Sequence, residues 1–318
     1  MKKHWETLKN CFPMVGFVLV VVLFGILTKG ALFNSNALNT MLNQVMLTAL
    51  VSIGSVFIFG AGCFDMSMGG TLCMSAVVGC YTAIATGSIW MMLLGCLGTS
   101  LALNLLKGFF AAYVEVPLFI VTIVLGSILS ALVLLVMGTE TTIFLNNAVS
   151  PIPEFNPTQL LILNAAVLAG YYLLCVVLFN YTRLGREIKL LGGNPVTFRQ
   201  TGLSGPKVKL LAFTVCALGV ALAAFVMLAR TRTAGASSAG SMGTDVMVAL
   251  VLGGMPLTGG PRSRISAGLV GSATITVLNL GLTMMGLSTA VIQVCRAVVF
   301  LGVVYVASMT YRTKLLPR

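Results

Sequence analysis

The fold of this chain is decided by stretches such as PLFIVTIVLGSILSALVLLVM, residues 117–137, in which no side chain is charged. At 1.5 Å per residue, a helix of about 20 residues matches the roughly 30 Å hydrocarbon core of a bilayer. Backbone amides in lipid must be paired inside the protein, and the stretch lacks the two-residue alternation of a membrane barrel strand. We therefore predict a transmembrane helix here.

The composition extends this prediction to the whole chain. Of its 318 residues, 58% are hydrophobic and 8% are charged, and the mean hydropathy is +1.03. Soluble domains are about a quarter charged. The sequence thus predicts an all-α, polytopic integral membrane protein of about ten transmembrane helices, forming a single transmembrane domain over residues 1–318.

Hydropathy separates ten apolar spans, with ends uncertain by several residues. They are Phe12–Thr28, Met41–Ala61, Ser67–Thr86, Ile89–Leu106, Pro117–Met137, Leu160–Tyr181, Val208–Ala229, Asp245–Leu257, Ile265–Met285 and Ser288–Met309. The span around Val248 is short, and those around Thr71 and Leu93 are rich in Gly and Ser, so a broken or re-entrant helix would reduce the count to nine. Asp65 and Asp245 each adjoin a Gly-rich bend, on opposite sides of the membrane in this topology, which suggests an inverted repeat.

The net charge of +12 reports orientation rather than nucleic-acid binding. With a cytoplasmic N-terminus, one side collects Lys2, Lys3, Lys9, Lys107, Arg183, Arg186, Lys189, Arg199, Lys207, Lys209, Arg262, Arg264, Arg312, Lys314 and Arg318. The other side has only Lys29, Arg230 and Arg232. This asymmetry is the positive-inside bias, so we predict two cytoplasmic termini, contact with anionic lipid and no nucleic-acid partner.

Missing motifs exclude several chemistries. The chain has no phosphate-binding G-x-x-x-x-G-K-[ST] loop, no H-E-x-x-H and no G-x-S-x-G, so we predict no catalytic residue and no ATP hydrolysis by this chain. His4 is the only histidine and the eight cysteines are scattered, which predicts neither a metal site nor a cofactor. None of the seven acidic residues falls at the centre of a predicted span, which argues against a proton- or sodium-driven carrier.

The main predicted cytoplasmic loop, residues 182–207, contains RLGREIKLLGGNPVTFRQTGL at positions 183–203. Asn194 suits a helix N-cap, Pro195 the first helical position, and Gly202 the left-handed residue that ends a helix. The sequence thus predicts a helix of one to two turns over Val196–Thr201, too short to be stable without a packing partner. A solvated basic loop with a chance turn is the alternative.

At this loop the chain resembles the permease family of sugar-type ABC importers, which includes ribose and xylose permeases. The matching elements, in order, are Asp65-Met-Ser-Met-Gly69, Pro117-Leu-Phe-Ile-Val-Thr122, Gly185-Arg186, Gly192-Gly-Asn-Pro195 with Gly202, Asp245–Gly254 with Leu257-Thr-Gly-Gly260, and Asn279 with Gly281-Leu282. Thr258 and Pro261 depart from the family pattern, so the resemblance does not define the substrate in detail.

The resemblance implies a coupling helix that docks on a separate ATP-binding subunit in the bacterial inner membrane. The implied coupling residues are Arg186, Gly192, Gly193, Asn194, Pro195, Phe198, Arg199 and Gly202. A second permease copy, as a homodimer or heterodimer, and an extracytoplasmic solute-binding protein would complete the importer. The solute is expected to be a monosaccharide; nucleosides, autoinducer-2 and branched-chain amino acids remain open, as does a secondary transporter or channel not coupled to ATP.

Polar and aromatic side chains in the spans are candidates for the solute pathway: Asn104, Phe119, Asn279, Gln293 and Arg296. Sugar recognition requires hydrogen-bonding groups and aromatic faces, but amides within spans also serve helix packing. Arg296 could snorkel, bond backbone carbonyls or face a water-filled cavity, and we favour a buried structural role. The segments Gly138–Pro157 and Arg230–Asp245 are the expected docking surface for the binding protein, or solvated connectors.

Overall fold

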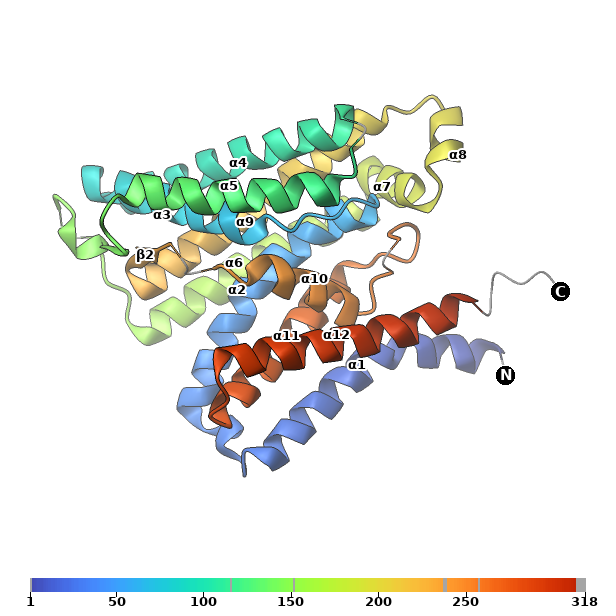
Figure 1. Cartoon of the computed structure of the whole chain (residues 1–318), viewed down its shortest axis with the longest axis horizontal. Helices are drawn as coiled ribbons and strands as arrows, with labels where there is room; N and C mark the ends of the chain where they lie inside the picture. The colour runs from blue at the N-terminus through green and yellow to red at the C-terminus, as the bar shows by residue number, and fades with distance from the viewer. Residues whose placement is uncertain (1, 115, 151, 237–238, 257, 313–318) are drawn as a thin grey trace.

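The computed structural model describes residues 2–114, 116–150, 152–236, 239–256 and 258–312. Its elements in chain order are α1 (Lys2–Leu27), η1 (Ala31–Phe33), α2 (Ser35–Gly60), α3 (Met68–Thr86), α4 (Ile89–Tyr113), α5 (Leu118–Met137), β1 (Thr142–Phe144), η2 (Leu145–Asn147), α6 (Pro157–Asn180), α7 (Arg183–Gly193), α8 (Pro195–Gln200), α9 (Gly205–Thr231), β2 (Thr233–Gly235), α10 (Met242–Leu252), α11 (Ile265–Met284) and α12 (Thr289–Arg312). The long helices lie side by side, and the start of α1, the end of α12 and the α7–α8 pair all lie at one end of the bundle (Figure 1).

The helices confirm the all-α, polytopic class. Seven of them, α2–α6, α9 and α11, are long and apolar enough to cross a membrane, and shorter apolar helical stretches occur at Pro13–Leu27, Met242–Leu252 and Thr289–Tyr305. Each of these apolar helices overlaps one of the ten predicted spans, and the number of membrane crossings is approximately as predicted. Leu257, the predicted end of one span, lies outside the described residues.

The middle of the bundle is formed by α2 and α9, whereas α4, α5 and α6 lie at its periphery. The most hydrophobic windows of α2 and α9 are 67% and 72% buried, against 22% for α4 and 17% each for α5 and α6. Leu135 on α5 and Leu173 on α6 are 76% and 63% exposed. Exposed leucines of this kind match lipid contact, because lipid rather than water solvates the faces of membrane-spanning helices.

Two non-helical segments cross inside the bundle. One, residues 61–67, leads from α2 into α3, and the other, residues 239–241, immediately precedes α10. A Cβ added at Gly69 would overlap the carbonyl oxygen of Ala239, and one added at Gly243 would overlap that of Met66. The backbones therefore touch, and glycine is required because no side chain fits between them.

This crossing corrects one expectation and refines another. Asp65 and Asp245 do not lie on opposite sides of the membrane, because each is within two residues of the contact between Met66 and Gly243. The two halves of the chain nevertheless make matching helix contacts. In the first half α3 packs on α4, α5 and α9, and in the second half α10 packs correspondingly on α11, α12 and α2. Such matching is the packing that an internal repeat produces.

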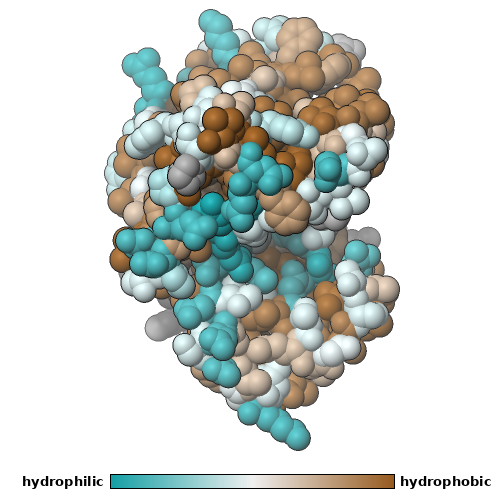
Figure 2. Space-filling view, turned by 90° about the vertical axis from the view of Figure 1, so that its left-hand side faces the viewer, coloured by the Kyte–Doolittle hydropathy of each residue, from teal (hydrophilic) through white to brown (hydrophobic). Residues whose placement is uncertain are grey.

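The bundle end opposite α7 and α8 is closed by a small sheet. Strand β1 pairs antiparallel with β2, with Thr142 opposite Gly235, so the two segments expected to form one outer surface are held together. Arg232 adds a hydrogen bond from Nε to Asn146 Oδ1 at 3.2 Å and a 3.6 Å ion pair with Glu154. On this end of the molecule, hydrophilic residues gather in a band between two more hydrophobic halves (Figure 2).

Candidate functional site

The short helix predicted after Asn194 is present as α8. Asn194 Oδ1 accepts hydrogen bonds from the amides of Val196 at 3.0 Å and Thr197 at 3.1 Å. Pro195 occupies the first turn, and Gly202 has the positive φ of +74° that follows the helix end. Each sequence signal thus does locally what was predicted, since the cap satisfies amides that have no partner within the helix.

The sequence did not predict the preceding helix, α7. Residues 183–193 form a helix that buries Ile188 and Leu191 and exposes Arg186. The signal was available in the three-residue spacing of Ile188 and Leu191, which places both on one helix face. Its short length and terminal glycines made the segment look like a loop.

The residues of α8 divide into an outward face and a buried anchor. Val196 is 68% exposed, whereas Phe198 is 2% exposed and packs into the main hydrophobic core. Phe198 therefore holds α8 to the bundle, and a partner protein would contact Val196 and its exposed neighbours Thr197 and Gln200. This location changes the interpretation of Phe198, which the family resemblance had placed among the coupling residues.

Backbone contacts join α7 to two other segments at a glycine junction, formed by Gly60 at the end of α2, Gly192 at the end of α7, and Gly260 in the loop before α11. The Gly260 amide donates to the Gly60 carbonyl at 3.0 Å. A Cβ at Gly192 would overlap that same carbonyl and lie 2.8 Å from the Gly260 amide nitrogen. Three chain segments are therefore in direct backbone contact immediately before α8.

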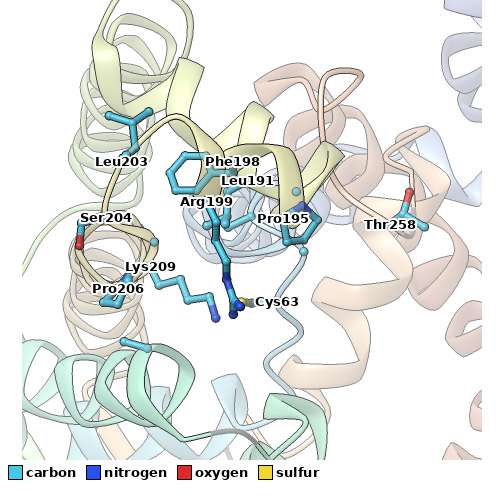
Figure 3. A pocket seen from close by; sticks show the side chains of 16 residues that line it. Cys63, Leu191, Pro195, Phe198, Arg199, Leu203, Ser204, Pro206, Lys209 and Thr258 are labelled. Atoms are coloured by element: carbon cyan, nitrogen blue, oxygen red, sulfur yellow. The ribbon is translucent and has the colours of Figure 1, made fainter.

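A cavity of about 610 Å³ lies beside α8 (Figure 3). Its walls are contributed by residues 61–63 after α2, the end of α4, the end of α7, α8, residues 202–204 and the start of α9, together with Thr258. Of the eight predicted coupling residues, five line this cavity: Gly192, Pro195, Phe198, Arg199 and Gly202. The other three do not: Arg186 is exposed on α7, Asn194 caps α8, and Gly193 faces Pro261.

The predicted pathway residues are not brought together as a set. Asn104 is fully buried where α4 packs on α9; its Nδ2 donates to the Ser100 carbonyl at 2.9 Å, and Ser100 Oγ donates to the Ala217 carbonyl at 2.8 Å. This placement favours the helix-packing alternative for Asn104. Phe119 is 41% exposed near the start of α5, and Asn279 lies on α11 with an Oδ1 that has no hydrogen-bond partner among the described residues.

Arg296 forms an ion pair with Asp245, which connects α12 to the first turn of α10. Asp245 also accepts a 3.0 Å hydrogen bond from Ser241 Oγ, while Gln293, one helical turn before Arg296, is exposed. Pairing with a carboxylate was not among the roles considered for Arg296. The available signal was the presence of two opposite charges in apolar spans, each of which needs a partner in lipid.

Lys107 corrects a second expectation, because it is not a loop residue. The helix α4 continues to Tyr113 rather than ending at Leu106. Lys107 is 1% exposed, and its Nζ donates to Asp65 Oδ2 at 2.7 Å and Thr71 Oγ1 at 3.0 Å. Because the charge is paired, the helix tolerates it at a buried position.

Comparisons with known proteins agree with this architecture. Residues 37–307 match a family described as the permease component of branched-chain amino acid transport systems. The chain is 28% identical over 282 residues to the ribose import permease protein RbsC of Escherichia coli (strain K12), covering 86% of each chain. It is 27% identical to the galactofuranose transporter permease protein YtfT of the same strain, covering 90% of this chain and 83% of the relative.

A solved structure shares the fold. It is described as an inward-facing conformation of an ABC transporter of metal-chelate type, and it superposes with a TM-score of 0.53 over 93% of this chain and 98% of the other. At 16% sequence identity, this similarity concerns the arrangement of the helices alone.

Proposed function

This chain belongs to the family of permease components of branched-chain amino acid transport systems, and we propose that it is the membrane-spanning subunit of a bacterial ABC importer for a monosaccharide. A separate subunit hydrolyses ATP, a second permease copy completes the membrane part, and an extracytoplasmic binding protein delivers the solute. The α7–α8 end of the bundle faces the cytoplasm, and the β1–β2 end faces the binding protein.

One observation carries this proposal: a capped helix with an exposed outer face is fixed to the bundle through the glycine junction. Val196 is available to a partner, while Phe198 and Gly192 attach α8 and α7 to the membrane helices. A movement of α8 must therefore displace α2 and the loop before α11. This is how closure of an ATPase dimer would be transmitted to the pore as a rigid-body step.

The proposal that the solute is a monosaccharide is based on the names of similar proteins. Similar chains are named as permeases for ribose, galactofuranose, fructose and xylose. In this chain Ser241, Thr244 and Gln293 present neutral polar groups near the Asp245–Arg296 pair. Neutral hydrogen-bonding groups beside a charge already neutralised suit a polyhydroxylated, uncharged solute.

A secondary carrier is less well supported. Such proteins use ionisable groups at membrane depth to bind the coupling ion. Here Asp65 is paired with Lys107 and Asp245 with Arg296. With both carboxylates already occupied by internal cations, neither is free to take up a proton or sodium ion in each cycle.

The proposal is tested by reconstitution in proteoliposomes with the cognate ATPase and binding protein. We expect labelled ribose, or another pentose or hexose from a panel, to accumulate only when ATP and both partners are present. Uphill accumulation by this chain alone would contradict the proposal, and import of a branched-chain amino acid in place of every sugar would refute the assigned solute class.

Val196→Asp tests the outer face of α8. We expect at least about 10-fold weaker binding of the ATPase subunit, because a charge would have to be desolvated at an apolar contact. The unfolding temperature should not change, since Val196 is 68% exposed. Val149→Asp is the matched control: Val149 is 82% exposed at the other end of the bundle and should leave ATPase binding unchanged.

Gln293→Ala tests the pathway face of α12. We expect an increase of about 3- to 10-fold in the KM for transport with an unchanged unfolding temperature, because an exposed hydrogen-bonding group is lost without a buried contact. Asn104→Ala should do the opposite and lower the unfolding temperature, because it removes the buried hydrogen bond from Asn104 to the Ser100 carbonyl. A KM unaffected by Gln293→Ala would remove this residue from the pathway.

A further inference from the structure

The cavity beside α8 contains two cationic groups, and its described lining residues include no acidic side chain. Its wall includes Arg199 from α8 and Lys209 from α9, and none of its lining residues is Asp or Glu. Both side chains extend into the same space from different sides, with the guanidinium and ammonium groups facing the centre of the cavity (Figure 3). Their positive charges are therefore gathered at one place.

Among the residues that the structure describes, no acidic group neutralises either charge. The Lys209 ammonium donates to the carbonyl oxygen of Ala111 at 2.6 Å, which is a neutral acceptor. The Arg199 side chain has no hydrogen bond or ion pair among the described residues. Two like charges that share a cavity repel each other, and an anion between them would convert this repulsion into two charge-assisted hydrogen bonds.

We infer that this cavity receives a carboxylate side chain of the ATPase subunit, which binds Arg199 and Lys209 together. This inference rests on the proposed function, because it places the ATPase against α8. A volume of about 610 Å³ accommodates an Asp or Glu side chain together with the tip of the loop that carries it. Charge complementarity selects an acidic side chain over a basic or apolar one.

A protein side chain fits the site better than a lipid headgroup does. The cavity is lined by parts of four helices, α4, α7, α8 and α9, together with residues 61–63, residues 202–204 and Thr258. It therefore opens among the elements that would face the ATPase rather than on the lipid-contacting flank of α5 or α6. The carboxylate would also have a mechanical role. By binding Arg199 and Lys209 together it would connect α8 to α9, the most buried of the spanning helices.

The test measures binding of the cognate ATPase to the purified permease at increasing salt concentrations. Arg199→Gln and Lys209→Gln should each weaken binding by about 10-fold at low salt and flatten its salt dependence, as expected for the loss of an interfacial charge pair. Lys207→Gln is the matched control, since Lys207 is exposed two residues away and does not line the cavity. It should change binding less than about twofold.

Arg199→Gln keeps the test decisive if Lys209→Gln impairs folding through loss of the bond to Ala111. Unchanged ATPase affinity and salt dependence in Arg199→Gln would overturn the inference. So would a selective loss of binding to anionic-lipid nanodiscs with normal ATPase binding, because the occupant would then be a lipid headgroup. If Val196→Asp weakens ATPase binding while Arg199→Gln does not, the docking of α8 stands and only the cavity assignment fails; if neither does, the docking role itself is wrong.

Discussion

Gly192→Ala is expected to lower the free energy of unfolding by about 2–4 kcal/mol and to abolish ATP-driven uptake. The added methyl group would overlap the carbonyl oxygen of Gly60 and crowd the amide of Gly260. Both neighbours are backbone atoms joined by a hydrogen bond, so no side-chain rotation relieves the clash. The ends of α2 and α7 must separate, and α8 would lose its fixed position.

Thermal unfolding in detergent and uptake in proteoliposomes measure the two effects. Gly193→Ala is the matched control, because its Cβ would lie 3.1 Å from the Pro261 ring and meet no backbone atom within 4 Å. We expect this variant to differ from the parent by no more than about 1 kcal/mol. Equal behaviour of the two alanine variants would show that the glycine junction does not determine the position of α8.

Lys107→Met is expected to destabilise the protein by about 3–5 kcal/mol, because it leaves the Asp65 carboxylate buried without its cation. Asp65 would keep the bonds from Ser67, whose amide lies at 2.8 Å and whose Oγ lies at 2.6 Å from Oδ1, but these do not replace a positive charge. The Asp65→Asn/Lys107→Met double variant should recover most of the loss, since it removes both charges.

A double-mutant cycle on thermal or denaturant unfolding gives the coupling energy of this pair. The control is Glu154→Gln, which removes the ion pair with Arg232; Glu154 is 76% exposed, and exposed pairs contribute about 0–1 kcal/mol. A coupling energy between Asp65 and Lys107 as small as that of the exposed pair would contradict the structural role assigned here.

Hydropathy predicted the spanning helices well because the preference of a span for lipid depends mainly on its own composition. Residues such as those of 117–137 become helical through composition alone, and α5 (Leu118–Met137) follows the prediction within one residue. The cap of α8 was equally accessible, since Asn194 and Pro195 act on their immediate neighbours. Both effects depend on residues that are neighbours in the sequence, so they can be predicted from a single sequence.

Contacts between segments that are far apart in the sequence could not be predicted in this way. Lys107 was assigned to a loop because its charge suggests exposure, and only the position of Asp65, 42 residues away in sequence, explains its burial. The role of Gly192 likewise depends on Gly60 and Gly260. Asp245 and Arg296 each attracted attention singly, but their pairing requires knowing that α10 and α12 are neighbours.

The short α10 has a consequence for how this protein is made. Its 11 residues span about 16 Å, roughly half of the hydrocarbon thickness. A helix of that length does not cross the hydrocarbon core by itself, and unpaired backbone amides at its ends would be costly in lipid. We therefore expect α10 to enter the bilayer against the segment around Met66, whose carbonyl meets Gly243, rather than as an independent span.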